Sequence, residues 1–254
     1  MAACNLQRTG WRDELKDAGR GAANSLCSGV LAEVAEQIRV ELLEAGLNGG
    51  QLLDIGCWDG AATLNYASAV GARPFGVEVF ADMAERARSL GVQVAEVDLE
   101  QEGLPWADNA MDVVVCNQVL EHLKNIWGAI SEIFRVVKAN GTVICSVPNL
   151  SSLHNRILLC IGRQPTSIRV MGPHVRGFTF SEFRSFLSAG FKIERIRTTG
   201  FHPLPPAYTK PLCRLLPSLG HTTICVCTKV SAADGWWRMS PARMRQLQTH
   251  YRGV

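Results

Sequence analysis

Short apolar runs alternate with segments of helical period through most of this chain, and this rhythm restricts the fold more than any other feature. An apolar run at 51–55 precedes a helical pattern at 61–70, and similar apolar runs follow at 74–79, 92–97 and 111–116. Strands that alternate with helices form right-handed crossover units in which successive strands run parallel. The sequence therefore predicts an α/β protein with a Rossmann-like, doubly wound, mostly parallel sheet.

The second half of the chain predicts the remaining elements. Apolar residues from Val119 to Val137 keep the three/four spacing of one long helix, which Asn140 and Gly141 would end. The further expected segments are a strand at 142–147, an irregular insertion at 149–178, a helix at 180–189, a strand at 191–199, a Pro-rich stretch at 202–211 and a strand at 222–230. With the four apolar runs named above, these three strands make seven.

Three parts of the chain follow from this pattern. Residues 1–49 form an N-terminal segment whose helix, expected at 24–45, would cover the cleft of the main domain. Residues 50–230 form that domain, and its insertion at 149–178 resembles a lid. Residues 231–254 are read as a C-terminal tail.

Composition and charge narrow the class of protein. Hydrophobic residues make up 47% of the chain and charged residues 19%, as in a folded globular protein. The net charge of +3 gives no broad basic field for nucleic acid. No apolar stretch approaches the length of about 18 residues needed to span a bilayer, so we expect no stable membrane insertion. Nine scattered cysteines and an amino terminus without an apolar core predict reduced thiols and a cytoplasmic protein.

The turn after the first strand carries the first functional signal. Gly56 and Gly60 allow a sharp turn and a close approach to a ligand. The dinucleotide fingerprint is absent, because Trp58 and Ala61 stand where its later glycines belong, and no phosphate-binding Gly-Lys-Ser/Thr follows. Asp54 would repel a phosphate and attract an ammonium group, unless it only caps the turn.

Two further acids follow the next two strands. Glu78 could accept hydrogen bonds from ribose hydroxyls, and Asp98 could accept one from the amine of adenine. Each alone is commonly a solvated acid at a strand end. Together with Asp54, at three successive strand ends, they predict a pocket for an adenosine that carries positive charge.

These motifs carry a resemblance to a known family. The segments LLDIGCWDG, GVEVF, VDLE, PWADNAMDVVVCNQVLEHL and NGTVICSVPN resemble those of the class I S-adenosylmethionine-dependent methyltransferases. The resemblance spans about residues 50–200 and the final strand. It implies a seven-stranded sheet whose final strand is antiparallel, S-adenosylmethionine as cofactor, and methyl transfer as the activity.

The resemblance also assigns site residues. The residues that it places at the cofactor are Asp54, Gly56, Cys57, Trp58, Gly60, Glu78, Val79, Asp98, Leu99, Asn117, Gln118 and Val119. Asp54, Gly56 and Gly60 would hold the methionine part, Glu78 would bind the ribose, Asp98 and Leu99 would border the adenine, and Asn117 with Gln118 would line the pocket floor. Trp58 replaces a glycine that is usual in the family.

His122 and His174 are the candidate catalytic residues, since a base would help to deprotonate an acceptor hydroxyl. His122 could instead pack near the cofactor at a helix start, and His174 could fasten a loop. Enzymes similar to those of the ubiquinone pathway have Glu where this chain has Gln118 and can hold a divalent ion there. Because Gln118 lacks that negative charge, we predict no metal here.

The expected function is methyl transfer to an oxygen of a small-molecule or glycan-like acceptor, with no nucleic-acid partner. The alternatives are a regulatory protein that binds S-adenosylmethionine without turnover, which Trp58 and Gln118 favour, and an NAD(P)-dependent oxidoreductase, which the glycine pattern disfavours. The apolar segment 157–161 would either pack the insertion onto the domain or face a lipid-like acceptor. The sequence does not specify the acceptor or the oligomeric state.

Overall fold

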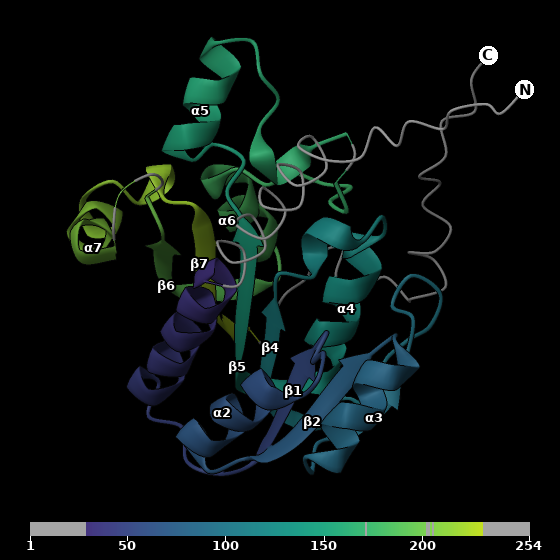
Figure 1. The fold of residues 1–254 in the computed structure, drawn as a ribbon. Helices are drawn as coiled ribbons and strands as arrows, with labels where there is room; N and C mark the ends of the chain where they lie inside the picture. The colour runs from purple at the N-terminus through teal and green to yellow at the C-terminus, as the bar shows by residue number, and fades with distance from the viewer. Residues whose placement is uncertain (1–28, 171, 202–203, 205, 231–254) are drawn as a thin grey trace, which may run out of the picture.

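A seven-stranded sheet forms the centre of the computed structural model, which describes residues 29–170, 172–201, 204 and 206–230 (Figure 1). The strands are β1 (Gln51–Ile55), β2 (Arg73–Glu78), β3 (Gln93–Glu96), β4 (Met111–Asn117), β5 (Val137–Pro148), β6 (Phe191–Thr199) and β7 (Thr222–Lys229). Their order is β3-β2-β1-β4-β5-β7-β6, and only β7 runs antiparallel to its neighbours. The predicted doubly wound, mostly parallel sheet with an antiparallel final strand is confirmed.

Helices cover both faces of this sheet (Figure 1). They comprise residues 29–44, α2 (Ala61–Val70), α3 (Ala81–Ser89), α4 (Ile126–Val136), α5 (Leu153–Cys160), α6 (Phe180–Ser188) and α7 (Pro206–Leu215), with short 3-10 turns η1 (Leu120–His122), η2 (Thr166–Ile168) and η3 (Pro217–Leu219).

Strand β4 shows how the two faces are filled, because its side chains alternate between two apolar clusters. Val113 and Val115 pack with the helix at 29–44 and with α2. Val114 and Cys116 pack with α4 and α6 on the opposite face. All four side chains are fully buried.

The helix at 29–44 is fastened to the sheet by a buried acid as well as by its apolar face. The Glu41 carboxylate is fully buried and accepts hydrogen bonds from Nε of Arg195, at 2.8 Å, and from Nε of Arg197, at 3.2 Å. Both arginines lie on β6. Residues 1–28, with the first part of the helix expected at 24–45, and the tail at 231–254 lie outside the described residues.

The single long helix predicted between Val119 and Val137 is wrong. The chain forms η1 first, and α4 begins only at Ile126, where the side chain of Asn125 accepts a hydrogen bond from the Gly128 amide at 3.0 Å. A cap of this kind starts a helix, which explains the late beginning. Val137 already pairs with Met111, so Asn140 and Gly141 lie inside β5 and cap no helix.

Two segments expected to be irregular contain helices. The Pro-rich stretch continues into α7, which starts at Pro206, a position that suits proline, and tolerates Pro211 in its interior. The insertion at 149–178 contains α5 and η2, and a bridge between Asn149 and Phe178 closes its base. Within the described ranges, no helix has the length and apolar character that crossing a membrane requires.

Candidate functional site

The loop from β1 to α2 is held tightly against its neighbours. The amides of Gly56 and Cys57 both donate to the Val77 carbonyl, at 2.8 and 3.0 Å. Gly56 has a φ of 73°, and a Cβ there would lie 2.7 Å from Cγ2 of Val119. Gly60 has a φ of 82°, and its Cβ would lie 2.8 Å from Cβ of Ala87. The two glycines are therefore required by packing as well as by backbone conformation.

Asp54 lies beneath this loop and is buried. Its Oδ2 accepts a hydrogen bond of 2.6 Å from the Thr63 hydroxyl, which comes from the first turn of α2. Burial raises the pKa of Asp54 to about 7, the Thr63 hydrogen bond opposes that rise, and the negative charge of Glu78 adds to it. The structure thus brings Asp54 and Glu78 near each other, as the sequence predicted.

The Glu78 carboxylate is buried and ties β2 to the loop. Its Oε2 accepts from the Trp58 amide at 3.0 Å, and its Oε1 accepts from the amides of Val79 and Phe80 at 2.9 and 3.0 Å. A carboxylate has about four acceptor sites, so Oε2 keeps one for a further donor.

Trp58 follows Cys57 at the outer side of the loop. Its φ is 49°, its side chain is 55% exposed, and its ring meets that of Phe80 edge to face, with centroids 6.1 Å apart. Cys57 is buried, whereas Val79 is exposed. The large ring that replaces the usual glycine therefore points toward solvent beside the loop.

Asp98 stands apart from the other two acids. Its Oδ1 accepts from the Glu100 amide at 2.9 Å and its Oδ2 from Nε2 of Gln101 at 3.1 Å, so the carboxylate closes its own turn after β3. Leu99 packs against the main apolar cluster. Among the described residues, no contact joins Asp98 to Asp54 or Glu78. A cavity of about 460 Å³ beside Phe75 and Trp106 contains none of the three acids.

The residues after β4 form a polar turn against β5. Oδ1 of Asn117 accepts from the Ser146 hydroxyl at 2.6 Å, and Nε2 of Gln118 donates to the same hydroxyl oxygen at 3.2 Å. Gln118 has a φ of 56°. Its side chain is therefore occupied at β5, while Val119 contacts the glycine loop.

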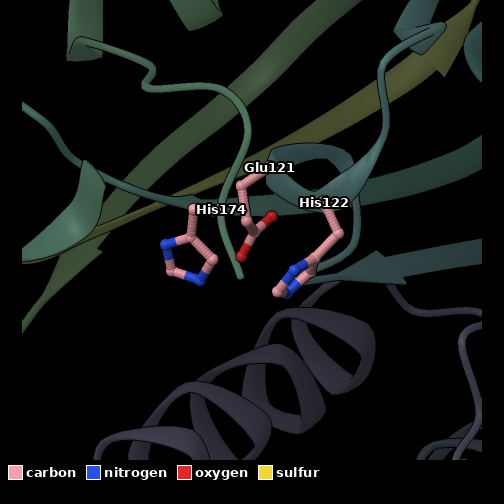
Figure 2. A group of neighbouring side chains, drawn as sticks. All are labelled: Glu121, His122 and His174. Atoms are coloured by element: carbon pink, nitrogen blue, oxygen red, sulfur yellow. The ribbon is translucent and has the colours of Figure 1, made fainter. Parts of the chain in front are cut away.

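Three side chains converge next to this turn, as Figure 2 shows: Glu121, His122 and His174. One ligand atom of each lies within 4.8 Å of the others. The two imidazole rings meet edge to face, with centroids 4.8 Å apart. Glu121 and His122 belong to η1, and His174 comes from the insertion, 52 residues further along the chain.

Backbone carbonyls fix both histidines. Nδ1 of His122 lies 3.3 Å from the Pro173 carbonyl oxygen, and Nδ1 of His174 lies 2.9 Å from that of Ser167. A carbonyl oxygen only accepts, so each Nδ1 carries the proton and each Nε2 keeps its lone pair. The amides of Val175 and Arg176 also donate to the Glu121 carbonyl, at 2.9 and 3.1 Å, and fasten the insertion to η1.

Glu121 is the unusual member of this cluster. It is 1% exposed, and its Oε2 has no hydrogen-bond partner among the described residues. Burial raises the pKa of Glu121 to about 8, while burial and the neighbouring His174 lower the pKa of His122. Two imidazole nitrogens and one carboxylate could hold a divalent cation. From the sequence, a metal site was considered only at Gln118. The group of Glu121, His122 and His174 was missed, because no local sequence pattern links His174 to η1.

Comparisons with known proteins identify the central region. Residues 53–145 match the family model described as a methyltransferase domain. The chain is 31% identical over 134 residues to a ubiquinone biosynthesis O-methyltransferase of Methylococcus capsulatus, covering 50% of this chain and 56% of that protein. It is 30% identical over 161 residues to a probable S-adenosylmethionine-dependent methyltransferase of Mycolicibacterium smegmatis, covering 58% and 53%. The chain thus spans about half the length of these relatives.

A solved structure shares the fold at low sequence identity. It is that of a possible histamine N-methyltransferase from Thermotoga maritima, with a TM-score of 0.56 and 20% identity, covering 83% of this chain and 96% of that one. The likeness shows a shared fold.

Proposed function

We propose that this chain is a class I S-adenosylmethionine-dependent methyltransferase and that it transfers a methyl group to an oxygen of a small-molecule or glycan-like acceptor. The observation that carries the proposal is the pair of buried carboxylates, Asp54 and Glu78, at the ends of adjacent strands on either side of a glycine loop. Similarity to a ubiquinone biosynthesis O-methyltransferase supports oxygen as the acceptor atom.

Asp54 and Glu78 fit the charge and hydroxyl pattern of this cofactor. Asp54 is buried with a single short hydrogen bond, so it can take the ammonium group of a methionine part. Glu78 has one acceptor position left on Oε2, which suits one ribose hydroxyl. The backbone of Gly56, Cys57, Trp58 and Gly60 would line the methionine part.

The remaining cofactor residues are assigned by their place in the sheet. Val79 follows Glu78 beside the ribose position, Asp98 and Leu99 would border the adenine, and Asn117, Gln118 and Val119 would form the floor. When bound, S-adenosylmethionine supplies a methyl group on a positively charged sulfur that leaves readily. The protein then has to align the acceptor and exclude water.

His122 and His174 are assigned to the acceptor. A backbone carbonyl fixes Nδ1 of each ring, so in the neutral tautomer Nε2 is free to take the proton of an acceptor hydroxyl. We expect His174→Ala to lower turnover about a hundredfold, as loss of a general base does. Affinity for S-adenosylhomocysteine should stay unchanged, which separates this role from cofactor binding.

The cofactor site is tested with Asp54→Asn, which keeps the shape of the side chain and the Thr63 hydrogen bond. Calorimetry should show that S-adenosylhomocysteine binds about tenfold or more weakly, because a charge-assisted hydrogen bond to its ammonium group is lost. Methylthioadenosine, which lacks the amino-acid part, serves as the control ligand, and its affinity should not change.

Two results would contradict the proposal in different ways. Equal loss of both ligands would mean that Asp54 supports the loop and does not contact the ammonium group. Cofactor binding without methylated product across broad panels of hydroxylated acceptors would favour the regulatory alternative.

A further inference from the structure

The insertion exposes an apolar surface at the outer end of the molecule. In Figure 1, α5 lies beyond the carboxyl ends of β4 and β5, farthest from the sheet. Three aliphatic side chains of this region, Ile157, Leu159 and Ile161, are 52%, 57% and 63% exposed, and Val170 is 83% exposed. Packing of segment 157–161 onto the domain, one of the two sequence expectations, is therefore wrong for these side chains.

α5 buries a polar residue and exposes two of its aliphatic side chains. Its buried residue is Asn155, at 1% exposure, whose amide donates to the Asn149 carbonyl and to the Ser167 hydroxyl at 3.2 and 3.1 Å. A helix on a water-exposed surface buries its apolar side chains and exposes its polar ones. Here Asn155 is buried, and Ile157 and Leu159 are exposed, which indicates a surface that meets a nonaqueous partner.

The charged residues of this segment have one sign. No acidic residue occurs in the sequence between Glu132 and Glu182, whereas Arg156, Arg163 and Arg169 are exposed and belong to the same segment as the apolar side chains. Exposed apolar side chains and exposed arginines in one segment are the composition of a segment that lies in the interface of an anionic bilayer.

We propose that the segment from Arg156 to Val170 docks on the surface of a membrane that contains anionic lipids. Ile157, Leu159, Ile161 and Val170 would enter the boundary between headgroups and acyl chains, and the three arginines would contact the phosphates. This binding requires no membrane span and no methyl transfer, so it stands independently of the proposed function.

The site lies within reach of the same segment. Ser167 and Pro173 hold the rings of His174 and His122, so the chain that carries the apolar surface also carries groups of the acceptor cluster. Docking through α5 would place that cluster on the side of the molecule near the lipid.

The test is co-sedimentation of the full chain with vesicles. Vesicles of phosphatidylcholine and phosphatidylglycerol are compared with vesicles of phosphatidylcholine alone, at low and high salt. We expect binding to the anionic vesicles only, weakened by salt. Replacing Ile157, Leu159 and Ile161 together by serine should weaken binding about tenfold or more. Arg163→Gln and Arg169→Gln should each weaken it about fivefold.

Matched controls lie on α3 and just after it, away from the insertion. Leu90→Ser removes a side chain of 51% exposure, and Arg86→Gln removes an exposed arginine. Neither should change vesicle binding. The proposal is overturned if the unchanged protein stays in the supernatant, or if the insertion variants and the controls bind alike. It is also overturned if the serine variant separates a dimer into monomers at unchanged vesicle binding, because a second copy would then cover this face.

Discussion

Close contacts between single atoms decide which substitutions the glycine loop tolerates. The φ of Gly60 is 82°, and an added Cβ would lie 2.8 Å from Cβ and 2.9 Å from Cα of Ala87. Two separate costs therefore act at this residue, one from backbone strain and one from the overlap with α3. At Asp54, burial raises the pKa of the carboxyl to about 7, and the hydrogen bond from Thr63 offsets only part of that rise.

We predict that Gly60→Ala lowers the free energy of unfolding by about 3 kcal/mol, because strain and overlap add. Urea unfolding measures this. Gly46→Ala is the control, since Gly46 has a φ of 66° with nothing within 4 Å of its added Cβ, and it should lose about 1 kcal/mol from strain alone. If both variants lost the same free energy of unfolding, the overlap with Ala87 would contribute nothing at Gly60.

A second prediction concerns pH and Asp54. The pKa of its carboxyl is about 7 in the folded protein against an ordinary value of 3.8, so the folded state binds more protons between these values. The free energy of unfolding should therefore fall as pH rises, by about 3 kcal/mol between about pH 5 and about pH 8. Asp54→Asn should reduce this fall by most of that amount. Parallel pH curves for the two proteins would contradict the assignment.

At the scale of elements, a polar contact joins the helix at 29–44 to β6. The Glu41 carboxylate has no exposed surface, whereas Arg195 is 28% exposed. Removal of an arginine would leave the buried Glu41 carboxylate with less positive charge to offset its burial. The contact therefore affects stability mainly through the free energy that is lost when it is broken.

We predict that Arg195→Ala lowers the free energy of unfolding by about 2 kcal/mol, a value reduced for the partial exposure of the arginine. Lys192→Ala on the same strand is the control, because its pair with Glu194 is largely exposed and should contribute nothing measurable. Urea unfolding of both variants decides the matter. A loss for Lys192→Ala as large as that for Arg195→Ala would show that the buried acid has no special role.

At the scale of the whole molecule, the site depends on segments that the sheet brings together from distant parts of the chain. The glycine loop contacts β2, α3 and Val119, and the insertion returns to η1 through Pro173 and His174. A ligand that bridges these segments binds only the folded state, so its binding free energy adds to the stability of the domain.

We predict that S-adenosylhomocysteine at about one hundred times its dissociation constant stabilises the protein by about 2.7 kcal/mol. For a domain of this size, that corresponds to a rise of roughly 5–10 °C in the midpoint of thermal unfolding. Methylthioadenosine at the same multiple of its own dissociation constant should give the same rise. An unchanged midpoint with both ligands would argue against an adenosine site in this fold.

The strand ends and the glycine turn could be predicted from the sequence by itself, because alternating apolar runs and the residues between them are local properties. The same reasoning placed Asp54 and Glu78 at neighbouring strand ends. It failed where a side chain, such as the Asn125 cap, outweighed the apolar spacing that predicted one long helix.

The sequence by itself determined the seven strands in their order along the chain and the acids at the ends of the first two. Only the tertiary structure decided that His174 meets Glu121 and His122, that Gln118 turns to β5, and that α5 presents Ile157 and Leu159 to solvent. The physical reason is that periodicity records only which face of an element is apolar. What lies opposite that face depends on where loops of many residues return, and no short-range pattern encodes that path.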